Sequence, residues 1–235
     1  MSRIFVIPDV HLKPWIYDRA AELVSESKYD AVVMLGDIAD DWNQGFNVGL
    51  YKDTYEAAGK FATEHPNTYW CYGNHDISYV WQLTESGYSH HARKTAVEGF
   101  ESLKAALPEG HAAFLIRFDD TLFSHAGLFS SFVERYFHDP AENDIDKMIS
   151  TINSMGPDKL WMDDSPIWAR PHDNGLIRTY PEDYFQVVGH TPVSKPVLYD
   201  NLLVLDTFSI YSNGRPIGNG RFACVDTKTH EFFEI

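Results

Sequence analysis

Short apolar runs alternate with amphipathic stretches over the first third of the chain. Residues 4–7, 31–35 and 68–72 are apolar and rich in β-branched or aromatic residues, which is typical of buried strands. Between them, residues 17–27 and 54–64 carry apolar residues among charged ones as amphipathic helices do, and Thr54 is a candidate N-cap. This order predicts a parallel sheet with right-handed crossovers.

The rest of the chain changes to a pattern rich in short strands. Helices are predicted at residues 92–107, 130–136 and 144–154, and a hairpin at 113–118 and 121–124. Further strands are predicted at residues 185–188, 197–199, 202–205, 222–225 and 232–235. Residues 40–49 and 155–180 lack a regular pattern, and long loops of this kind are often functional. We expect one α/β domain that spans residues 1–235.

The charge of the chain excludes some classes of partner. The net charge is -15, from 19 basic and 34 acidic side chains, and 44% of the residues are hydrophobic. Extended nucleic acids and anionic membranes bind through basic patches, so neither is an expected partner. A compact nucleotide stays possible, because bound metals would reverse the local field.

The cysteines and the N-terminal residues bear on location. Cys71 and Cys224 lie in strand-like runs without metal-type spacing, so we expect two buried, reduced thiols. The first residues lead directly into a strand and do not resemble a signal peptide. Since no apolar stretch approaches the ~20 residues of a membrane span, a cytoplasmic protein is the expectation.

Clusters of Asp, His and Asn follow the strand-like runs. They contain Asp9 and His11, Asp37 and Asp40, Asn74 and His75, His125, and His190. The carboxyl ends of strands in open α/β sheets border the ligand-binding crevice, and mixed oxygen and imidazole donors suit Mn, Fe, Zn or Mg. Each cluster alone also fits a structural role, as a turn, a cap or a lone structural histidine.

Several spacings favour the metal-binding interpretation. Asp9 and His11 alternate along an extended chain, so they share a face and can meet one ion. The Asp37 carboxylate can bridge two ions. Asp40 could fix the tautomer of a nearby imidazole, and His75 could donate a proton to a leaving alkoxide.

The order Asp-x-His, Gly-Asp-x-x-Asp, Gly-Asn-His-Asp, His and Gly-His closely resembles the calcineurin-like metallophosphoesterase superfamily, from Asp9 to His190. The resemblance implies a four-layer αββα sandwich and two divalent metal ions, Mn above all, with Fe, Zn, Ni or Mg as alternatives. It implies that His75 is the proton donor and that Asp40 orients it. The implied ligands are Asp9, His11 and Asp37 for one metal, and Asp37, Asn74, His125 and His190 for the other.

Two segments indicate which branch of that superfamily the chain resembles. Gly189-His190-Thr191-Pro192 lacks the second His of many phosphodiesterases, and is similar to the Ser/Thr phosphatase and symmetrical diadenosine tetraphosphatase branch. Trp168-Ala169-Arg170 resembles the segment that supplies a phosphate-binding arginine there, and a guanidinium suits bidentate phosphate contact. The chain departs from the branch at Asp41-Trp42, where Arg-Gly is usual, and at Leu12, where Gly is usual.

The sequence therefore predicts a dinuclear phosphohydrolase, with Arg170 and Asn74 on the phosphate. We expect a phosphomonoesterase that acts on a phosphorylated small molecule, nucleotide or phosphoprotein. The alternatives are a phosphodiesterase or dinucleoside polyphosphate hydrolase, and a catalytically silent metal-binding scaffold, which would have no need of His75. Trp15 and Trp42 follow metal clusters and are candidates for a cleft wall that stacks on a nucleobase.

Overall fold

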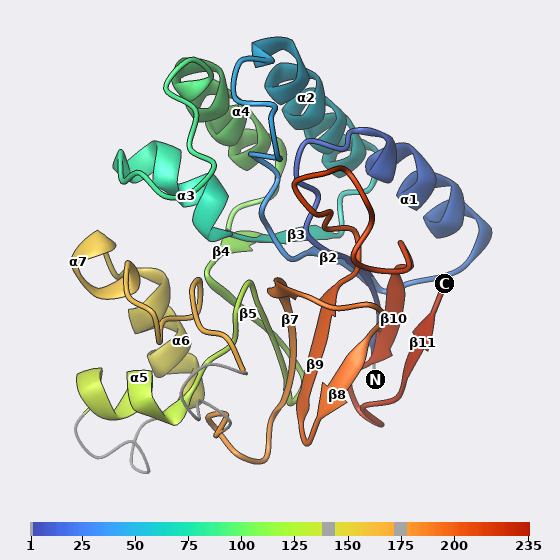
Figure 1. The fold of residues 1–235 in the computed structure, drawn as a ribbon. Helices are drawn as coiled ribbons and strands as arrows, with labels where there is room; N and C mark the ends of the chain where they lie inside the picture. The colour runs from blue at the N-terminus through green and yellow to red at the C-terminus, as the bar shows by residue number, and fades with distance from the viewer. Residues whose placement is uncertain (1, 138–143, 172–177) are drawn as a thin grey trace.

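The fold has two mixed β-sheets packed face to face, with helices on both outer sides (Figure 1). It is seen in a computed structural model that describes residues 2–137, 144–171 and 178–235. The four layers confirm the αββα sandwich expected from the sequence.

The first sheet has the strand order β11-β10-β1-β2-β3-β4. Neighbours from β1 to β4 pair in parallel, while β10 pairs antiparallel with β1 and β11 antiparallel with β10. The predicted parallel β-α-β-α-β unit is therefore confirmed. The strands are β1 (Arg3–Ile7), β2 (Ala31–Met34), β3 (Thr68–Cys71), β4 (Ala112–Ala113), β10 (Ala223–Asp226) and β11 (Phe232–Glu234).

The second sheet has the order β5-β6-β7-β9-β8. The predicted hairpin is present as the antiparallel pair β5 and β6, and β6, β7 and β9 run parallel to one another. The strands are β5 (Leu115–Phe118), β6 (Thr121–Ser124), β7 (Phe185–Pro192), β8 (Val197–Tyr199) and β9 (Leu202–Asp206).

Helices α1, α2 and α4 lie over the first sheet, and α5, α6 and α7 lie beside β5 of the second (Figure 1). Their bounds are α1 (Trp15–Glu26), α2 (Val48–Glu64), α3 (Asn74–Trp81), α4 (Arg93–Ala106), α5 (Ser130–Tyr136), α6 (Ile145–Asn153) and α7 (Pro157–Leu160). The buried residues of α2, among them Tyr51, Tyr55, Ala58 and Ala62, recur at helical spacing because one face packs on the core.

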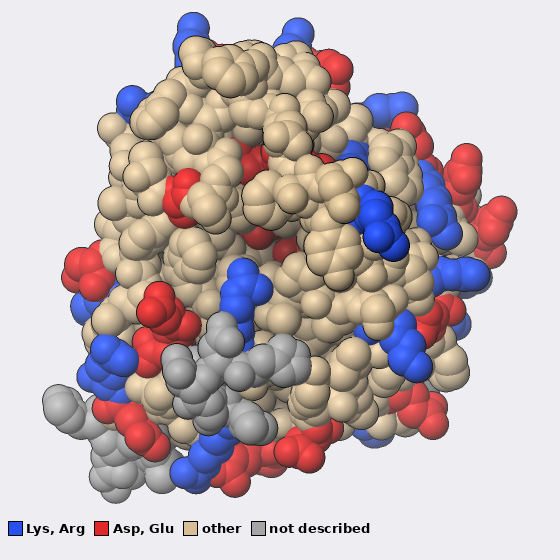
Figure 2. All heavy atoms as spheres, viewed as in Figure 1, with Lys and Arg blue, Asp and Glu red and all other residues tan. Residues whose placement is uncertain are grey.

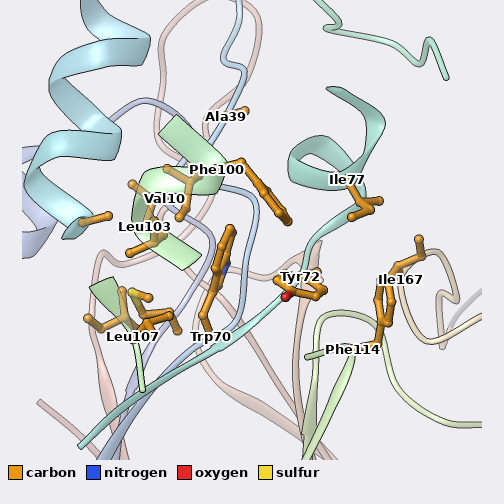
Figure 3. Close-up of a cluster of buried hydrophobic side chains, with 14 of the residues drawn as sticks. Val10, Ala39, Trp70, Tyr72, Ile77, Phe100, Leu103, Leu107, Phe114 and Ile167 are labelled. Atoms are coloured by element: carbon orange, nitrogen blue, oxygen red, sulfur yellow. The ribbon is translucent and has the colours of Figure 1, made fainter. Parts of the chain in front are cut away.

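The central strands of the first sheet are buried on both faces. In β1, Ile4 and Val6 face the second sheet while Phe5 and Ile7 pack under the helices. A strand covered on both sides reads as a continuous apolar run, which is why the sequence predicted it. On the helix side, the ring of Trp70 lies 4.8 Å from the Phe100 ring of α4, near Leu103 and Leu107 (Figure 3).

Four expectations about elements need correction. Helix α2 begins at Val48, so Thr54 is not its N-cap; the Thr54 hydroxyl donates to the Leu50 carbonyl inside the helix. Residues 74–81 form α3, which the sequence pattern did not predict, and β7 continues past Val188 to Pro192. The irregular stretch 155–180 contains α7, and its residues 172–177 lie outside the described ranges.

Cys71 and Cys224 are free and buried, as expected. Within the residues that the structure describes, no helix combines the length and apolar character needed to cross a membrane.

Candidate metal centre

The predicted site residues meet where the carboxyl ends of parallel strands from both sheets converge. Asp9, Asp37 and Asn74 follow β1, β2 and β3, while His125 follows β6 and His190 lies near the end of β7. Because parallel strands end at a common edge, side chains far apart in sequence gather there.

Two overlapping groups of side chains at this edge could each hold a divalent ion. One group is Asp37, His125 and His190, and the other is Asp9, His11 and Asp37. Asp37 belongs to both. Asn74, which the sequence also predicted as a ligand, lies beside the first group, with Oδ1 2.9 Å from His125 Nε2.

The tautomers in the first group leave lone pairs facing one another. His125 Nδ1 donates to the Leu35 carbonyl at 2.8 Å, and His190 Nε2 donates to the Trp168 carbonyl at 3.1 Å. His125 Nε2 and His190 Nδ1 lie only 3.0 Å apart, and in neutral rings each of these nitrogens carries a lone pair. Asp37 Oδ2 lies 3.2 Å from the same His125 nitrogen.

Acceptors that converge in this way repel one another unless a cation lies among them, so the donor set fits a divalent metal ion. The pKa of His125 reflects the same demand for positive charge. Burial disfavours the charged ring, yet the negative charge of Asp37 outweighs burial and raises the pKa of His125 to about 9.

The side chains of the second group, Asp9, His11 and Asp37, are also oriented by backbone hydrogen bonds. His11 Nδ1 donates to the Asp40 carbonyl at 2.9 Å, which leaves Nε2 facing Asp37 Oδ2 at 3.8 Å. Both oxygens of Asp9 accept the backbone N–H of His190, at 3.1 and 2.9 Å. Burial, followed by the charge of Asp206, raises the pKa of Asp9 well above its usual value.

Four of the site residues have left-handed backbone conformations. The φ angles are 45° for His11, 48° for Asp37, 62° for Asp40 and 60° for His190. Such conformations cost non-glycine residues about 1–3 kcal/mol each and concentrate at functional sites. In His190 the conformation coincides with a register shift in β7, and a bulge of this kind redirects a side chain.

Glycine is required where two segments of the site approach each other closely. Gly36 has a φ of 97°, and an added Cβ would lie 2.5 Å from the Gly73 nitrogen. At Gly189, an added Cβ would lie 1.9 Å from Asp9 Oδ1. The Gly residues before Asp37 and His190 in the motifs therefore have a steric cause.

Gly189→Ala is expected to displace Asp9, to weaken metal binding at the Asp9 group and to destabilise the fold by about 1–3 kcal/mol, as overpacking does. Isothermal titration with Mn²⁺ and thermal unfolding would measure both effects. Gly59→Ala is the matched control, because its added Cβ meets nothing within 4 Å on α2. Equal metal affinity in the two variants would contradict the steric argument.

His75 and Asp40 form a hydrogen-bonded pair beside the metal groups. His75 Nδ1 lies 3.0 Å from Asp40 Oδ2, and the hydroxyls of Tyr51 and Tyr79 donate to Asp40 Oδ1 at 2.6 and 2.5 Å. The backbone N–H of His75, in the first turn of α3, donates to Asp37 Oδ1 at 3.0 Å. These contacts fix the position of the pair relative to Asp37.

The charges around His75 favour its protonated form. Burial disfavours the imidazolium, but Asp37, Asp40 and Glu85 outweigh burial and raise the pKa of His75 well above its usual value. A ring whose protonated form is favoured has a proton to give.

A cavity of about 420 Å³ opens over the two candidate metal-binding groups. The hollow in this face exposes acidic side chains at its floor, with Lys or Arg side chains near its margin (Figure 2). Arg170 lines the cavity and donates from its guanidinium to the His190 carbonyl at 2.7 Å. Trp42 forms part of the wall and is 56% exposed, whereas Trp15 packs on Phe208 and is not among the lining residues that the structure describes.

Sequence reasoning missed two carboxylates next to the site. Asp206 is buried at the end of β9, lines the cavity and accepts the Ser209 hydroxyl at 2.9 Å. Its place directly after an apolar run was a signal that could have found it. Glu85 lies 3.1 Å from His75 Nδ1. It comes from an irregular segment, and no sequence pattern pointed to it.

A family model of the calcineurin-like phosphoesterases matches residues 2–217. The chain therefore belongs to this family, which makes it a hydrolase of phosphoric esters, as the sequence resemblance implied. No protein of curated function matches the chain in sequence.

Two solved structures show the same fold. A cold-active protein-tyrosine phosphatase of a psychrophile, Shewanella sp., aligns with a TM-score of 0.58 and 17% identity, over 100% of this chain and 80% of that one. A protein serine/threonine phosphatase from Saccharomyces cerevisiae aligns with a TM-score of 0.55 and 14% identity, over 100% and 80% of the respective chains. Identities this low bear on the fold alone.

Proposed function

We propose that this protein is a dinuclear, metal-dependent phosphomonoesterase. Asp9, His11 and Asp37 would hold one ion, and Asp37, Asn74, His125 and His190 the other. The observation that carries the proposal is the convergence of His125 Nε2, His190 Nδ1 and Asp37 Oδ2, beside a separate imidazole with a raised pKa. Manganese is our first choice, since carboxylate, amide and imidazole donors are mixed.

When bound, two divalent ions would supply a water of lowered pKa and would polarise the phosphoryl oxygens. Residues of the chain would donate the proton and orient the phosphate. His75 gives its Nε2 proton to the leaving-group oxygen while Nδ1 stays hydrogen-bonded to Asp40. Arg170 and Asn74 orient the phosphate. A metal-binding scaffold would not require a protonated, carboxylate-paired histidine in the cavity.

The charges of the cavity favour a monoester. Among the described residues that line it, Arg170 is the one Lys or Arg side chain, while Asp41 and Asp206 add negative charge. A monoester has a third non-bridging oxygen that one guanidinium can meet. A polyphosphate chain would bring additional charges next to these carboxylates, so the dinucleoside polyphosphate alternative is disfavoured.

The function is tested on protein purified without metal and reloaded with Mn²⁺. Its kcat/KM is compared for a matched aryl phosphomonoester and phosphodiester, a phosphopeptide and a dinucleoside polyphosphate. We expect the monoesters to be preferred. A preferred diester or polyphosphate would replace the proposal with the corresponding alternative, and a lack of turnover on all four would favour the scaffold.

Arg170→Ala is expected to lower kcat/KM for the monoester by about 10²–10³-fold, the effect of removing one preorganised charged contact. The loss should be much smaller for the diester, which lacks the third charged oxygen. Arg170→Lys should also be impaired, because an ammonium group does not reproduce the guanidinium fork. Arg93→Ala, at an exposed position at the start of α4, is the control. Wild-type activity in Arg170→Ala would contradict the assigned role.

A further inference from the structure

A second carboxylate besides Asp40 faces His75. Glu85 lies between α3 and α4, and its side chain is 4% exposed. Its Oε1 is 3.1 Å from His75 Nδ1, almost the same as the 3.0 Å from Asp40 Oδ2 to that nitrogen. Apart from this ion pair, neither Glu85 oxygen has a hydrogen-bond partner among the described residues. The Nδ1 side of His75 is therefore enclosed by two carboxylates.

The segment that carries Glu85 is braced against the His75–Asp40 pair. Gly87 has a φ of 117°, and a Cβ added there would lie 3.3 Å from His75 Cε1 and 3.5 Å from Asp40 Cβ. The Ser89 backbone N–H donates to the Tyr79 hydroxyl at 2.8 Å, and that hydroxyl donates to Asp40. The Ser89 side chain donates to the Gly45 carbonyl across the cavity wall. These contacts fix the backbone that follows Glu85 against the His75–Asp40 pair.

Burying the Glu85 carboxylate costs free energy that only its contact with His75 can offset. A buried carboxylate with few partners loses its hydration, and burial raises the pKa of Glu85 despite the opposing effect of His75. Packing alone would be served better by an apolar side chain at this position. Among the described residues, His75 is the one cationic or hydrogen-bonding group that Glu85 contacts, which points to a role through that ring.

We propose that Glu85 is a positioning residue that, together with Asp40, holds the His75 imidazole with Nδ1 toward the two carboxylates and Nε2 toward the cavity. The inference rests on the proposed function, because it assigns the purpose of the ring's orientation to proton donation at Nε2. Asp40 fixes the ring from the α2 side, through Tyr51, and Glu85 fixes it from the segment before α4.

The test compares Glu85→Gln with wild type on two phosphomonoesters of the Mn-loaded enzyme, one with nitrophenol and one with an alkyl alcohol as leaving group. Gln keeps the shape and removes the charge. We expect kcat to fall by about 10–100-fold for the alkyl ester, part of the usual worth of a general acid. For nitrophenol, which needs little protonation, kcat should fall less than about 3-fold, with KM and the content of two metals unchanged.

Glu56→Gln is the matched control, because Glu56 is an exposed residue of α2 that pairs with Lys52 away from the cavity. Glu85→Asp is a second variant that keeps the charge with a shorter reach, and it should show the same leaving-group pattern with a smaller loss. A readout apart from turnover is the exchange of the His75 Nδ1 proton with water in nitrogen-15 spectra, which should be faster in Glu85→Gln than in wild type.

The outcomes separate this inference from the proposed function. If wild type hydrolyses neither ester, the proposed function fails. If wild type is active and Glu85→Gln loses the same factor on both esters, or loses nothing, the positioning role is overturned. Unchanged exchange of the Nδ1 proton would overturn it as well. Selective loss on the alkyl ester with faster exchange is the supporting result.

Discussion

Asp37→Ala is expected to leave the protein with at most one bound metal ion and to lower kcat on phosphomonoesters by on the order of 10³–10⁴-fold. Stabilisation of transition-state charge by metal ions is worth several kcal/mol, which corresponds to this range. Asp37 is the member common to both candidate metal-binding groups, with Oδ2 3.8 Å from His11 Nε2 and 3.2 Å from His125 Nε2. Its loss therefore removes a ligand from each group at once.

The measurement is metal content by elemental analysis after Mn loading, together with the anomalous signal in crystals and the kinetics. Asp226→Ala is a suitable control, because Asp226 is also buried at the end of a strand but accepts hydrogen bonds from residues of its own turn, among them the backbone N–H groups of Lys228 and Thr229. Two metals near position 37 in the Asp37→Ala variant, with wild-type turnover, would refute the bridging role.

His75→Ala is expected to keep both metal ions and to lower kcat by roughly 10²–10⁴-fold, the usual contribution of general acid–base catalysis. His75 belongs to neither of the two groups that contain Asp37, so its removal leaves both of them intact. Its raised pKa favours the protonated ring, and the truncated variant has no replacement donor.

The loss should shrink for esters of nitrophenol, since a good leaving group departs without a proton. Kinetics across a series of aryl esters with different leaving-group pKa values, with metal content measured on the same samples, would test this. His230→Ala, which breaks an ion pair with Asp120 outside the cavity, is the control. An equal loss across the series, or a loss of metal, would contradict proton donation by His75.

Much of the fold could be predicted from the sequence because burial leaves local signals. β1, β2 and β3 are covered on both faces, so most of their residues are apolar, and α1, α2 and α4 bury one stripe each. The errors lie where local signals conflict with tertiary context. Residues 74–81 contain β-prone residues, yet they form α3, whose first turn donates to Asp37.

For the candidate site, too, the sequence predicted some features and left others open. The order of Asp, His and Asn residues after successive strands was sufficient to predict the residues that the structure gathers at one edge, because parallel strands end there together. Their roles as ligands, proton donor and phosphate contact stay predictions until the variants are measured.

The sequence by itself determined the strands, the residue types at their ends and the family, since these depend on burial and on motif order along the chain. Only the tertiary structure decided that Glu85 faces His75, that Asp206 borders the cavity, and that His125 Nε2 and His190 Nδ1 face one another. Those facts depend on contacts between distant segments and on the carbonyls that accept from each ring. The local pattern of apolar and polar residues predicts neither the long-range contacts nor the carbonyl partners of the rings.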